Sequence, residues 1–391
     1  MSPHRCAAVR QRSSEGAPAC VMVSGGGTGG HITPALALCE AWQARVPQLV
    51  LWYIGRAGSL EERMARAAGV PFAALPAAPL RPGLRGVLRC ALVNLRGVLS
   101  AFRLVRRMRP AVITGFGGYV SFPLMLAGVC LRRPVVVHEA NAVPGKTVRL
   151  LVWLGARLAY GLERGHDEFR HARTLRLHPE RVCWSGNPLR RAFLEDLQRA
   201  PQALPGLLPD VCTLLVLGGS QGSRRLNLLV PDAVRDVYAS GVRVQVIHLA
   251  GDADAAQVRA RYAAAGIPAF VAAFYERMGV LYRRADLVIA RAGALTISEI
   301  CARGVASVLV PFPHATEGHQ EANAAVLAEH GAALLVKEAG LEAAQLAGAV
   351  RELLLDHTRR AAMGAAARAH AVPDAAERLL DFIDECTRTL T

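Results

Sequence analysis

The 391-residue chain contains few aromatic residues and no closely paired cysteines. Phe, Trp and Tyr make up 5% of the sequence, which argues against a surface on which nucleic-acid bases stack. The nine cysteines are scattered without a C-x-x-C pair, and most lie in apolar runs. This distribution argues against disulfides and zinc ligands and indicates reduced, packed thiols in a cytosolic protein.

Acidic residues are scarce relative to basic ones. The 46 Lys and Arg residues exceed the 31 Asp and Glu residues and leave a net charge of +15. A field of this size attracts phosphate, anionic lipid or nucleic acid. No helix-turn-helix pattern or aromatic platform accompanies the charge, so we expect no nucleic-acid partner.

The sequence also lacks an apolar secretory segment and an uninterrupted membrane span. Residues 1–20 are charged and polar, and they are expected to be a flexible lead-in. The uncharged run 111–131 is long enough to cross a bilayer. Three glycines and Pro123, however, divide it into a strand, a turn and a short helix. We therefore expect a soluble or peripheral protein.

Short aliphatic and β-branched runs alternate with longer helical patterns along the chain. The candidate strands begin at residues 21, 49, 111 and 134 in the first half, and at 212, 243, 269, 285 and 307 in the second. This alternation predicts parallel βαβ units with helices on both faces of a sheet. We expect two Rossmann-like, doubly wound α/β domains that face a cleft.

The domain boundaries are predicted from where this pattern pauses and restarts. The N-terminal domain is expected to cover 21–187, and a Pro- and Leu-rich linker follows over 188–210. The second domain is expected to cover 211–372. A last helical stretch, 373–391, is expected to pack back on the first domain.

Three glycine-rich loops follow candidate strands: GGGTGGH at 25–31, GFGGYVSFP at 115–123 and GGSQGS at 218–223. Backbone amides at a helix N-terminus, uncrowded by Cβ atoms, favour phosphate and other anions. The first loop also matches the dinucleotide fingerprint G-x-G-x-x-G. That fingerprint requires an acidic residue at the end of the next strand. The chain reads YIGRAGS there and has no Asp or Glu. Nicotinamide binding is therefore disfavoured, and glycines that serve only tight turns are the alternative for any one loop.

The stretch ARAGALTISEI, 290–300, predicts a strand end, a turn and a helix that begins near Leu295. In this position Glu299 is able to accept hydrogen bonds from a ribose diol while the helix N-terminus faces a ligand phosphate. The alternative is a glutamate that only stabilises the helix dipole. The following strand leads into a polar loop, which is expected to point into the cleft and which carries His314, Glu317, His319 and Gln320.

Taken together, seven motifs resemble the MurG family of bacterial glycosyltransferases: GGTGGH, GFGGYVSFP, HEANAVPG, GNPLR, GGSQGSRRLN, AGALTISE and PFPHATEGHQEANA. They are collinear from about Val21 to Val372. The resemblance implies a GT-B fold, inversion at the anomeric carbon and no required metal or cofactor. It also implies transfer of N-acetylglucosamine from UDP-N-acetylglucosamine to the 4-hydroxyl of the muramyl sugar of undecaprenyl-pyrophosphoryl-N-acetylmuramyl-pentapeptide. This step of peptidoglycan synthesis takes place on the cytoplasmic face of the bacterial inner membrane.

The resemblance places the donor mainly on the second domain. It implies that Glu299 binds the ribose hydroxyls and that Ser220 and Gln221 of the glycine loop bind the α-phosphate. The backbone near Tyr275 is implied to read the uracil edge. Ala294 and Leu295 are implied to contact the donor through the backbone at the start of the helix. His319 and Gln320 are implied to contact the sugar hydroxyls, and Arg190 is implied to lie near the diphosphate.

The first-domain loops resemble the acceptor face of the family. Gly117, Gly118 and Tyr119 are implied on the acceptor side, and contacts to the donor sugar are implied for Thr28, Gly29, Gly30 and Asn141. The chain departs from the family at three positions, with His319 in place of a more frequent Gln, Ala140 in place of Gln, and Val148 in place of Asn. The last two departures affect the expected acceptor contacts around 138–149.

An inverting transfer requires a base for the acceptor hydroxyl and a group that holds the charge of the departing diphosphate. His31 is the candidate base, since it follows a glycine loop at a helix N-terminus, where the dipole keeps the ring neutral. Glu139 is the rival base. A capping or turn-stabilising side chain is the alternative role for His31.

The positive charge is concentrated in 80–110, which contains eight arginines, no acidic residue and many aliphatic side chains. Five of the arginines are expected to share one helical face and to face an anionic membrane: Arg85, Arg89, Arg96, Arg103 and Arg107. This requires that Gly86 and Gly97 do not interrupt the helix. Solvated helix faces over a core are the alternative.

Two other classes of function stay open from the sequence. Another GT-B transferase or a UDP-sugar epimerase would share the motifs around Gly218 and Glu299, but not GFGGYVSFP or HEANAVPG. A noncatalytic UDP-sugar-binding membrane adaptor would bind the donor without turnover, and the presence of both His31 and Glu139 argues against it.

Overall fold

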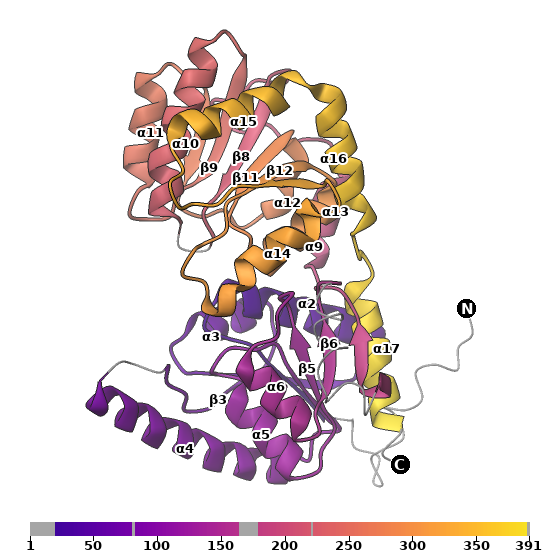
Figure 1. Ribbon diagram of the computed structural model, residues 1–391. Coiled ribbons are helices and arrows are strands. Elements are labelled where there is room, and N and C mark those ends of the chain that lie inside the picture. Colours follow the sequence, from indigo (N-terminus) through magenta and orange to yellow (C-terminus); the bar gives the residue numbers. More distant parts are fainter. Residues whose placement is uncertain (1–19, 80–82, 164–178, 220–221, 389–391) are drawn as a thin grey trace, which may run out of the picture. The chain divides into compact units, whose positions relative to one another are not determined.

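The computed structural model describes residues 20–79, 83–163, 179–219 and 222–388. The chain divides into two compact units, of which the first is formed by the residues up to Arg190 and those from Asp374, and the second by Arg191–Pro373. Each unit contains one parallel sheet (Figure 1). Apart from Cys20, the predicted lead-in lies outside the described residues.

The sheet of the first unit has seven parallel strands in the order β3-β2-β1-β4-β5-β6-β7. Its strands are Cys20–Ser24 (β1), Val50–Gly55 (β2), Phe72–Ala74 (β3), Val112–Gly115 (β4), Val135–Glu139 (β5), Arg157–Tyr160 (β6) and Val182–Trp184 (β7). The central strands β4 and β5 are buried along their whole length. Such burial is typical of parallel strands that helices cover on both faces.

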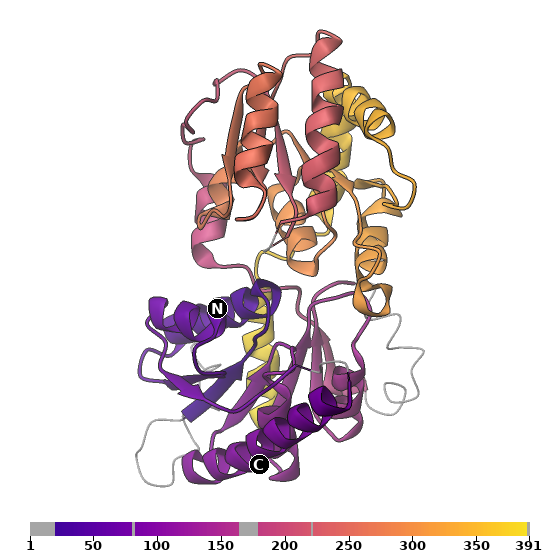
Figure 2. The same cartoon turned by 90° about the vertical axis from the view of Figure 1, so that its left-hand side faces the viewer.

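Successive β1 side chains point to opposite faces of this sheet, and each face has its own core. Val21 and Val23 contact the core formed with α2 (Gly29–Arg45), α3 (Leu60–Ala67) and α17 (Ala375–Arg388). Met22 contacts the other core, formed with α4 (Leu84–Met108), α5 (Phe122–Cys130) and α6 (Lys146–Trp153). The C-terminal helix α17 packs on α2, where Arg45 forms an ion pair with Asp381. Figure 2 shows helices on both sides of the sheet.

The sheet of the second unit has six parallel strands in the order β10-β9-β8-β11-β12-β13. They are Cys212–Leu217 (β8), Val244–Leu249 (β9), Ala269–Ala272 (β10), Leu287–Ala290 (β11), Ala306–Leu309 (β12) and Ala333–Leu335 (β13). Its helices are Arg191–Gln198 (α9), Arg224–Ala239 (α10), Ala255–Ala264 (α11), Met278–Arg284 (α12), Ala294–Arg303 (α13), His319–Ala328 (α14), Ala343–Leu355 (α15) and His357–Ala369 (α16). In the main core, β-strands pack with α10, α11 and α15.

The two doubly wound parallel sheets confirm the predicted fold class. In both sheets the strand order reverses between the first strand of the unit and its fourth, β1 beside β4 and β8 beside β11. The loops after these strands lie at the same carboxyl edge, where open α/β sheets bind ligands. The glycine loops at 25–31 and 218–223 therefore occupy equivalent positions in the two units.

The structure differs from the expected elements in three places. The short strands β3, β6, β7 and β13 were not expected, because three or four residues give little periodicity. The expected linker 188–210 contains α9, which packs on α12. Run 111–131 is indeed a strand, a turn and a short helix, and no described helix is long and apolar enough to span a membrane.

Helix α4 continues through both of its glycines over 25 residues. At Gly97 the helix passes close to Pro76, and a Cβ atom there would lie 2.1 Å from the Pro76 carbonyl oxygen. A glycine is therefore required by close packing at this point, and it does not end the helix.

Candidate functional site

The first glycine loop leads into α2, and it holds His31 through one backbone and one side-chain contact. The His31 Nδ1 atom lies 3.1 Å from the Gly26 carbonyl oxygen and 3.3 Å from Thr28 Oγ1. Because a carbonyl oxygen only accepts, Nδ1 carries the proton in the first contact, and a neutral ring then has its lone pair on Nε2. His31 is partly buried in the third position of α2. This arrangement fixes the ring orientation that a general base requires.

The second glycine loop of this unit, after β4, packs directly against the first. Gly118 has a φ of +78°, and a Cβ atom on it would lie 2.3 Å from the Gly26 carbonyl oxygen. A Cβ atom on Gly117 would lie 3.4 Å from His31 Nε2. The absence of side chains at Gly117 and Gly118 therefore lets this loop approach the imidazole, while Tyr119 beside them is partly buried.

The third loop of the first unit follows β5 and is organised by Glu139. One carboxylate oxygen accepts hydrogen bonds of 3.0 Å from both the backbone N–H and the side-chain amide of Asn141, and the other accepts a bond of 3.1 Å from the Gly145 N–H. Glu139 is 8% exposed. Three N–H groups thus converge on this carboxylate, which gives Glu139 a role in holding the 140–145 loop and favours His31 as the base.

Behind this loop lie two buried side chains that the sequence did not single out. His138 Nε2 lies 3.0 Å from the Gly186 carbonyl oxygen, and its ring packs against Phe116 at 4.9 Å between centroids. Burial lowers the pKa of His138 to about 4, so this ring is neutral at pH 7. Asn187 donates from Nδ2 to the Ala140 carbonyl oxygen at 3.1 Å. His138 belongs to the motif HEAN and Asn187 to the motif GNPLR, and membership in these motifs was the sequence signal that could have identified them.

Arg190, which was expected near the donor diphosphate, forms an ion pair with Glu40 of α2 at 2.6 Å. The two side chains are 29% and 30% exposed, respectively. The structure therefore gives Arg190 a partner in its own unit. Val148, one of the three departures from the family, lies on α6 and is 5% exposed in the core, where an apolar side chain suits its surroundings.

In the second unit the described part of the glycine loop is held by Arg291, which the sequence analysis missed. The Arg291 guanidinium donates to Ser223 Oγ from Nε at 3.1 Å and from Nη2 at 2.8 Å, and Nη1 donates to the carbonyl oxygens of Val310 and Pro311. It also forms an ion pair with Glu338 and lies over the Phe312 ring at 5.5 Å. Arg291 therefore joins the loop after β8 to the loop after β12.

Ser220 and Gln221, the expected phosphate contacts, lie outside the described residues. Glycines are required on both sides of these two residues, because a larger side chain would collide with the backbone. A Cβ atom on Gly218 would lie 2.3 Å from the Ser223 nitrogen. On Gly222, with a φ of +77°, a Cβ would lie 2.2 Å from the Ala250 carbonyl oxygen. The loop ends at Ser223, whose hydroxyl accepts from the Leu226 N–H at 3.4 Å and caps α10.

A buried polar network lies below this loop. Asn227 donates to the Ala250 carbonyl oxygen and to Asp254 Oδ2, both at 2.8 Å. Its side-chain oxygen Oδ1 lies 3.0 Å from His248 Nε2, and His248 Nδ1 lies 3.0 Å from the Tyr262 hydroxyl. Burial lowers the pKa of His248 to about 3, so the neutral ring connects the asparagine to the tyrosine.

Glu299 lies on α13, in the second turn after Ala294 and Leu295 begin the helix. Burial raises the pKa of Glu299 to about 7, and a hydrogen bond with Tyr282 acts in the opposite direction. A carboxylate in this position gains from hydroxyl donors, which would replace the water that burial removes. The expected ribose contact of Glu299 stays a prediction.

Two of the other expected donor residues begin helix α14, and the third follows strand β10. Gln320, in α14, accepts from the Phe312 N–H at 2.9 Å and so connects the helix to the loop after β12. His319 is the first residue of α14 and is partly buried. Tyr275 follows β10, and its ring meets Phe270 edge-on at 5.8 Å. None of these contacts involves a ligand, so their roles toward the donor stay predictions.

Comparisons with known proteins agree with this arrangement. The model of the Glycosyltransferase family 28 N-terminal domain matches residues 21–159, and that of the family 28 C-terminal domain matches residues 213–379. A UDP-N-acetylglucosamine:N-acetylmuramyl-(pentapeptide) pyrophosphoryl-undecaprenol N-acetylglucosamine transferase of Pseudomonas putida strain GB-1 is 39% identical over 93% of this chain and 96% of its own. The transferase of the same name from Geobacter sulfurreducens is 34% identical over 94% of this chain and 99% of its own.

Solved structures give the same result at the level of the fold. The crystal structure of Acinetobacter baumannii MurG has a TM-score of 0.71 and 28% identity, and the match covers 94% of this chain and all of that one. A structure described as a UDP-N-acetylglucosamine 2-epimerase of Listeria monocytogenes has 16% identity and a TM-score of 0.64. The match covers 93% of this chain and 95% of that chain, and at this identity it shows only that the folds are similar. From the sequence identity and its coverage, this chain belongs to the MurG family of glycosyltransferases.

Proposed function

We propose that this protein transfers N-acetylglucosamine, with inversion, from UDP-N-acetylglucosamine to the 4-hydroxyl of the muramyl sugar of undecaprenyl-pyrophosphoryl-N-acetylmuramyl-pentapeptide. The observation that carries this proposal is the 39% identity over 93% of the chain to a transferase named for this reaction. The orientation of His31 between two glycine loops supports it.

In the proposed reaction, His31 Nε2 takes the proton of the acceptor hydroxyl as its oxygen attacks the anomeric carbon. The bond from that carbon to the diphosphate breaks on the opposite face, and UDP leaves with the electron pair. Backbone amides of loop 218–223, at the N-terminus of α10, stabilise the developing negative charge. Glu299 holds the ribose hydroxyls, and Arg291 acts as a positioning residue, because it fixes Ser223 at the end of that loop.

The acceptor side of the proposal rests on the three loops of the first unit. Gly117 and Gly118 let the backbone of their loop approach the His31 ring, and we propose that the acceptor hydroxyl binds beside Nε2. Thr28 and Asn141 lie on the neighbouring loops as further polar contacts. We propose that no metal is required, since amides and cationic side chains supply the charge stabilisation.

Release of UDP by the purified full chain in EDTA tests the reaction. With a lipid-linked muramyl-pentapeptide analogue present, we expect UDP release from UDP-N-acetylglucosamine, and without the analogue we expect only a small background. Donor binding by calorimetry without acceptor-dependent release would contradict the transferase and favour a binding module. Release of free N-acetylglucosamine epimer would favour an epimerase.

We also propose that α4 places the first unit on the cytoplasmic surface of the inner membrane, as a peripheral protein. An exposed leucine stripe runs along α4, formed by residues that are 49–60% exposed: Leu88, Leu92, Leu95 and Leu99. At 100° per residue, the exposed arginines 85, 89, 96, 103 and 107 lie beside this stripe, rotated by roughly 70°. Gly97 and Val105 lie on the buried side of the helix.

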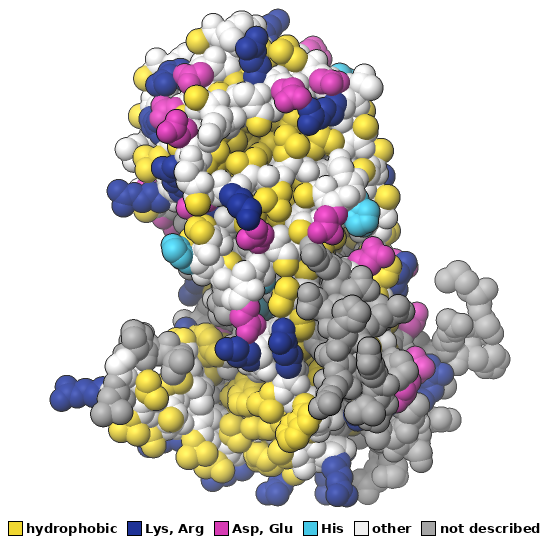
Figure 3. Space-filling view, viewed as in Figure 1, with side chains coloured by type: hydrophobic (Ala, Val, Ile, Leu, Met, Phe, Trp, Pro, Cys, Tyr) yellow, Lys and Arg dark blue, Asp and Glu magenta, His cyan; other side chains and the backbone are white. Residues whose placement is uncertain are grey.

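The chemistry of this surface favours an anionic leaflet. Each basic side chain near such a leaflet contributes about 1 kcal/mol, and aliphatic side chains enter the headgroup boundary. On α6, in the same unit, Trp153 is 70% exposed, and tryptophan is typical of the membrane interface. Figure 3 shows hydrophobic and basic side chains gathered on the surface of this unit.

Co-sedimentation with anionic and zwitterionic vesicles tests the membrane proposal. Leu95→Glu should weaken binding to anionic vesicles, while Leu355→Glu on α15 is the matched control, because the two leucines are 57% and 63% exposed. Binding that is indifferent to anionic lipid, to salt and to Leu95→Glu would contradict the proposal.

A further inference from the structure

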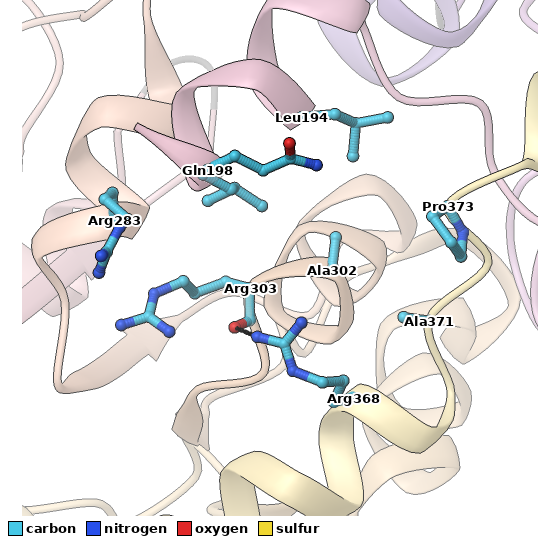
Figure 4. A pocket seen from close by; sticks show the side chains of 9 residues that line it. Leu194, Gln198, Arg283, Ala302, Arg303, Arg368, Ala371 and Pro373 are labelled. Atoms are coloured by element: carbon cyan, nitrogen blue, oxygen red, sulfur yellow. Dashed lines mark hydrogen bonds between the residues drawn. The ribbon is translucent and has the colours of Figure 1, made fainter. Parts of the chain in front are cut away.

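The second unit contains a cavity at the C-terminal end of α13, the end opposite Ala294 and Leu295. It has a volume of about 650 Å³, and three arginines from three different helices line it: Arg283 of α12, Arg303 of α13 and Arg368 of α16. Among the described residues that line it there is no acidic side chain. Figure 4 shows Arg303 and Arg368 close together, with Leu194 and Gln198 of α9 across the cavity from them.

Backbone carbonyl groups hold the three guanidinium groups in place. Arg303 donates from Nε to the Tyr282 carbonyl oxygen at 2.9 Å, and Arg283 donates from Nε to the Arg199 carbonyl oxygen at 3.1 Å. Arg368 donates from Nη2 to the Arg303 carbonyl oxygen. Carbonyl oxygens orient these cations but do not neutralise them, so three positive charges line one cavity.

The charges of the cluster repel each other. The pKa of Arg303 is lowered, first by burial and then by the positive charges of Arg283 and Arg368, and Asp286 acts in the opposite direction. An anion in the cavity would remove this repulsion, and planar guanidinium groups suit phosphate oxygens, which they bind in pairs.

The size and the other lining residues indicate more than a single inorganic ion. The cavity volume lies in the range that small organic ligands occupy. Leu194 and Pro373 supply apolar contact, and Gln198 supplies an amide. The formal charge of +3 from the arginines matches the three to four negative charges of a nucleoside di- or triphosphate, taken as roughly one per ionised oxygen.

We propose that this arginine pocket, formed by Arg283, Arg303 and Arg368, is a second anion site that binds a nucleoside polyphosphate. It is distinct from the donor site, although it shares α13 with Glu299, four residues before Arg303. The pocket also lies where the chain enters and leaves the second unit, since α9 begins at Arg191 and Pro373 ends the unit.

Calorimetry with ATP as the probe, on the full chain in EDTA, tests the pocket. The double variant Arg283→Gln/Arg368→Gln removes two cations and leaves Arg303, the last residue of α13, unchanged. We expect saturable ATP binding that persists with saturating UDP-N-acetylglucosamine, and a loss of about tenfold or more in affinity in the double variant. The matched control is Arg359→Gln on α16, which is outside the pocket and is ion-paired to Glu352.

The outcomes separate this pocket from the proposed transferase. Absence of ATP binding to the unchanged protein, or equal affinity in the double variant, would overturn the proposal. Inorganic pyrophosphate that binds as tightly as ATP would overturn the assignment to an organic phosphate. Unchanged thermal unfolding and UDP affinity in the double variant would show that the second unit is intact, and ATP binding is measurable whether or not the protein transfers sugar.

Discussion

The two glycine loops occupy the same topological position in their units, but they are stabilised by different chemistry. Loop 25–31 is shaped by backbone packing, because Gly118 approaches the Gly26 carbonyl oxygen, and it ends with the imidazole of His31. Loop 218–223 is held by a side chain, the buried guanidinium of Arg291 on Ser223. One strand-loop-helix arrangement therefore ends in an imidazole in the first unit and in a serine-capped helix in the second.

The largest effect is expected from removal of the imidazole. His31→Ala should lower kcat by about 10²–10⁴-fold, the usual contribution of a general base, with UDP affinity unchanged. Acceptor-dependent UDP release and calorimetry measure the two quantities.

Glu139→Gln is the informative partner of that variant. It keeps the size of the side chain but places an amide where the Gly145 N–H now donates. We expect mainly a higher KM for the acceptor. A fall in kcat as large as that of His31→Ala, with the loop still folded, would move the role of base to Glu139.

In the second unit the sensitive residue should be Arg291. Arg291→Met leaves Glu338, whose side chain is 18% exposed, without its cation and removes the donors to Ser223. We expect a loss that approaches about 3–5 kcal/mol, which is the cost of breaking a fully buried pair. Urea unfolding should show this loss, together with weaker UDP binding. Arg235→Met is the control: its side chain is 56% exposed, and it pairs with Asp232 at the surface, so about 1 kcal/mol or less is expected. Equal losses in the two variants would contradict the assigned role.

Two glycine variants distinguish the close packing of the first loop from the energetic cost of a left-handed backbone conformation. Gly118→Ala combines a φ of +78° with a Cβ atom 2.3 Å from a carbonyl oxygen, whereas Gly58→Ala has a φ of +68° and no atom within 4 Å. The left-handed conformation alone costs about 1–2 kcal/mol. We expect a larger loss of unfolding free energy for Gly118→Ala, and a lower kcat in that variant alone. Equal destabilisation would show that the contact between the loops is unimportant.

The smallest effect is the pH dependence of donor binding. The raised pKa of Glu299, about 7, means that the side chain is protonated below pH 7 and ionised above it. Ribose hydroxyls donate to the ionised form, so affinity for UDP-N-acetylglucosamine should be constant above pH 7 and fall by up to about tenfold per unit below it. Calorimetry between pH 5.5 and pH 8.5 tests this, and Glu299→Gln should abolish the slope. A slope that persists in that variant would place the titration on another group.

The sequence predicted the long elements well and the short ones poorly. Strands such as Val112–Gly115 and Leu287–Ala290 stand out as aliphatic runs between glycine-rich loops. Ala333–Leu335 has too few residues for a period, and only its pairing with β12 makes it a strand. Helix α9 was hidden by the Pro- and Leu-rich passage that follows it.

The residues of the candidate site also divide into those that the sequence predicted and those that it did not. His31, Glu139 and Glu299 were found because each belongs to a motif at a strand end. Arg291 was passed over because its partners, Ser223, Val310 and Glu338, are separated from it by up to 68 residues in the sequence and come together only through the parallel strand order.

By itself the sequence determined the two α/β repeats, the positive charge and the motifs of the family, since periodicity and composition are local properties. The tertiary structure alone decided that Gly118 lies against Gly26, that Asn141 and Gly145 donate to Glu139, and that three arginines surround one cavity. These depend on distances between residues far apart in the chain. Such distances follow from strand order and from the packing of helices, and no local pattern encodes them.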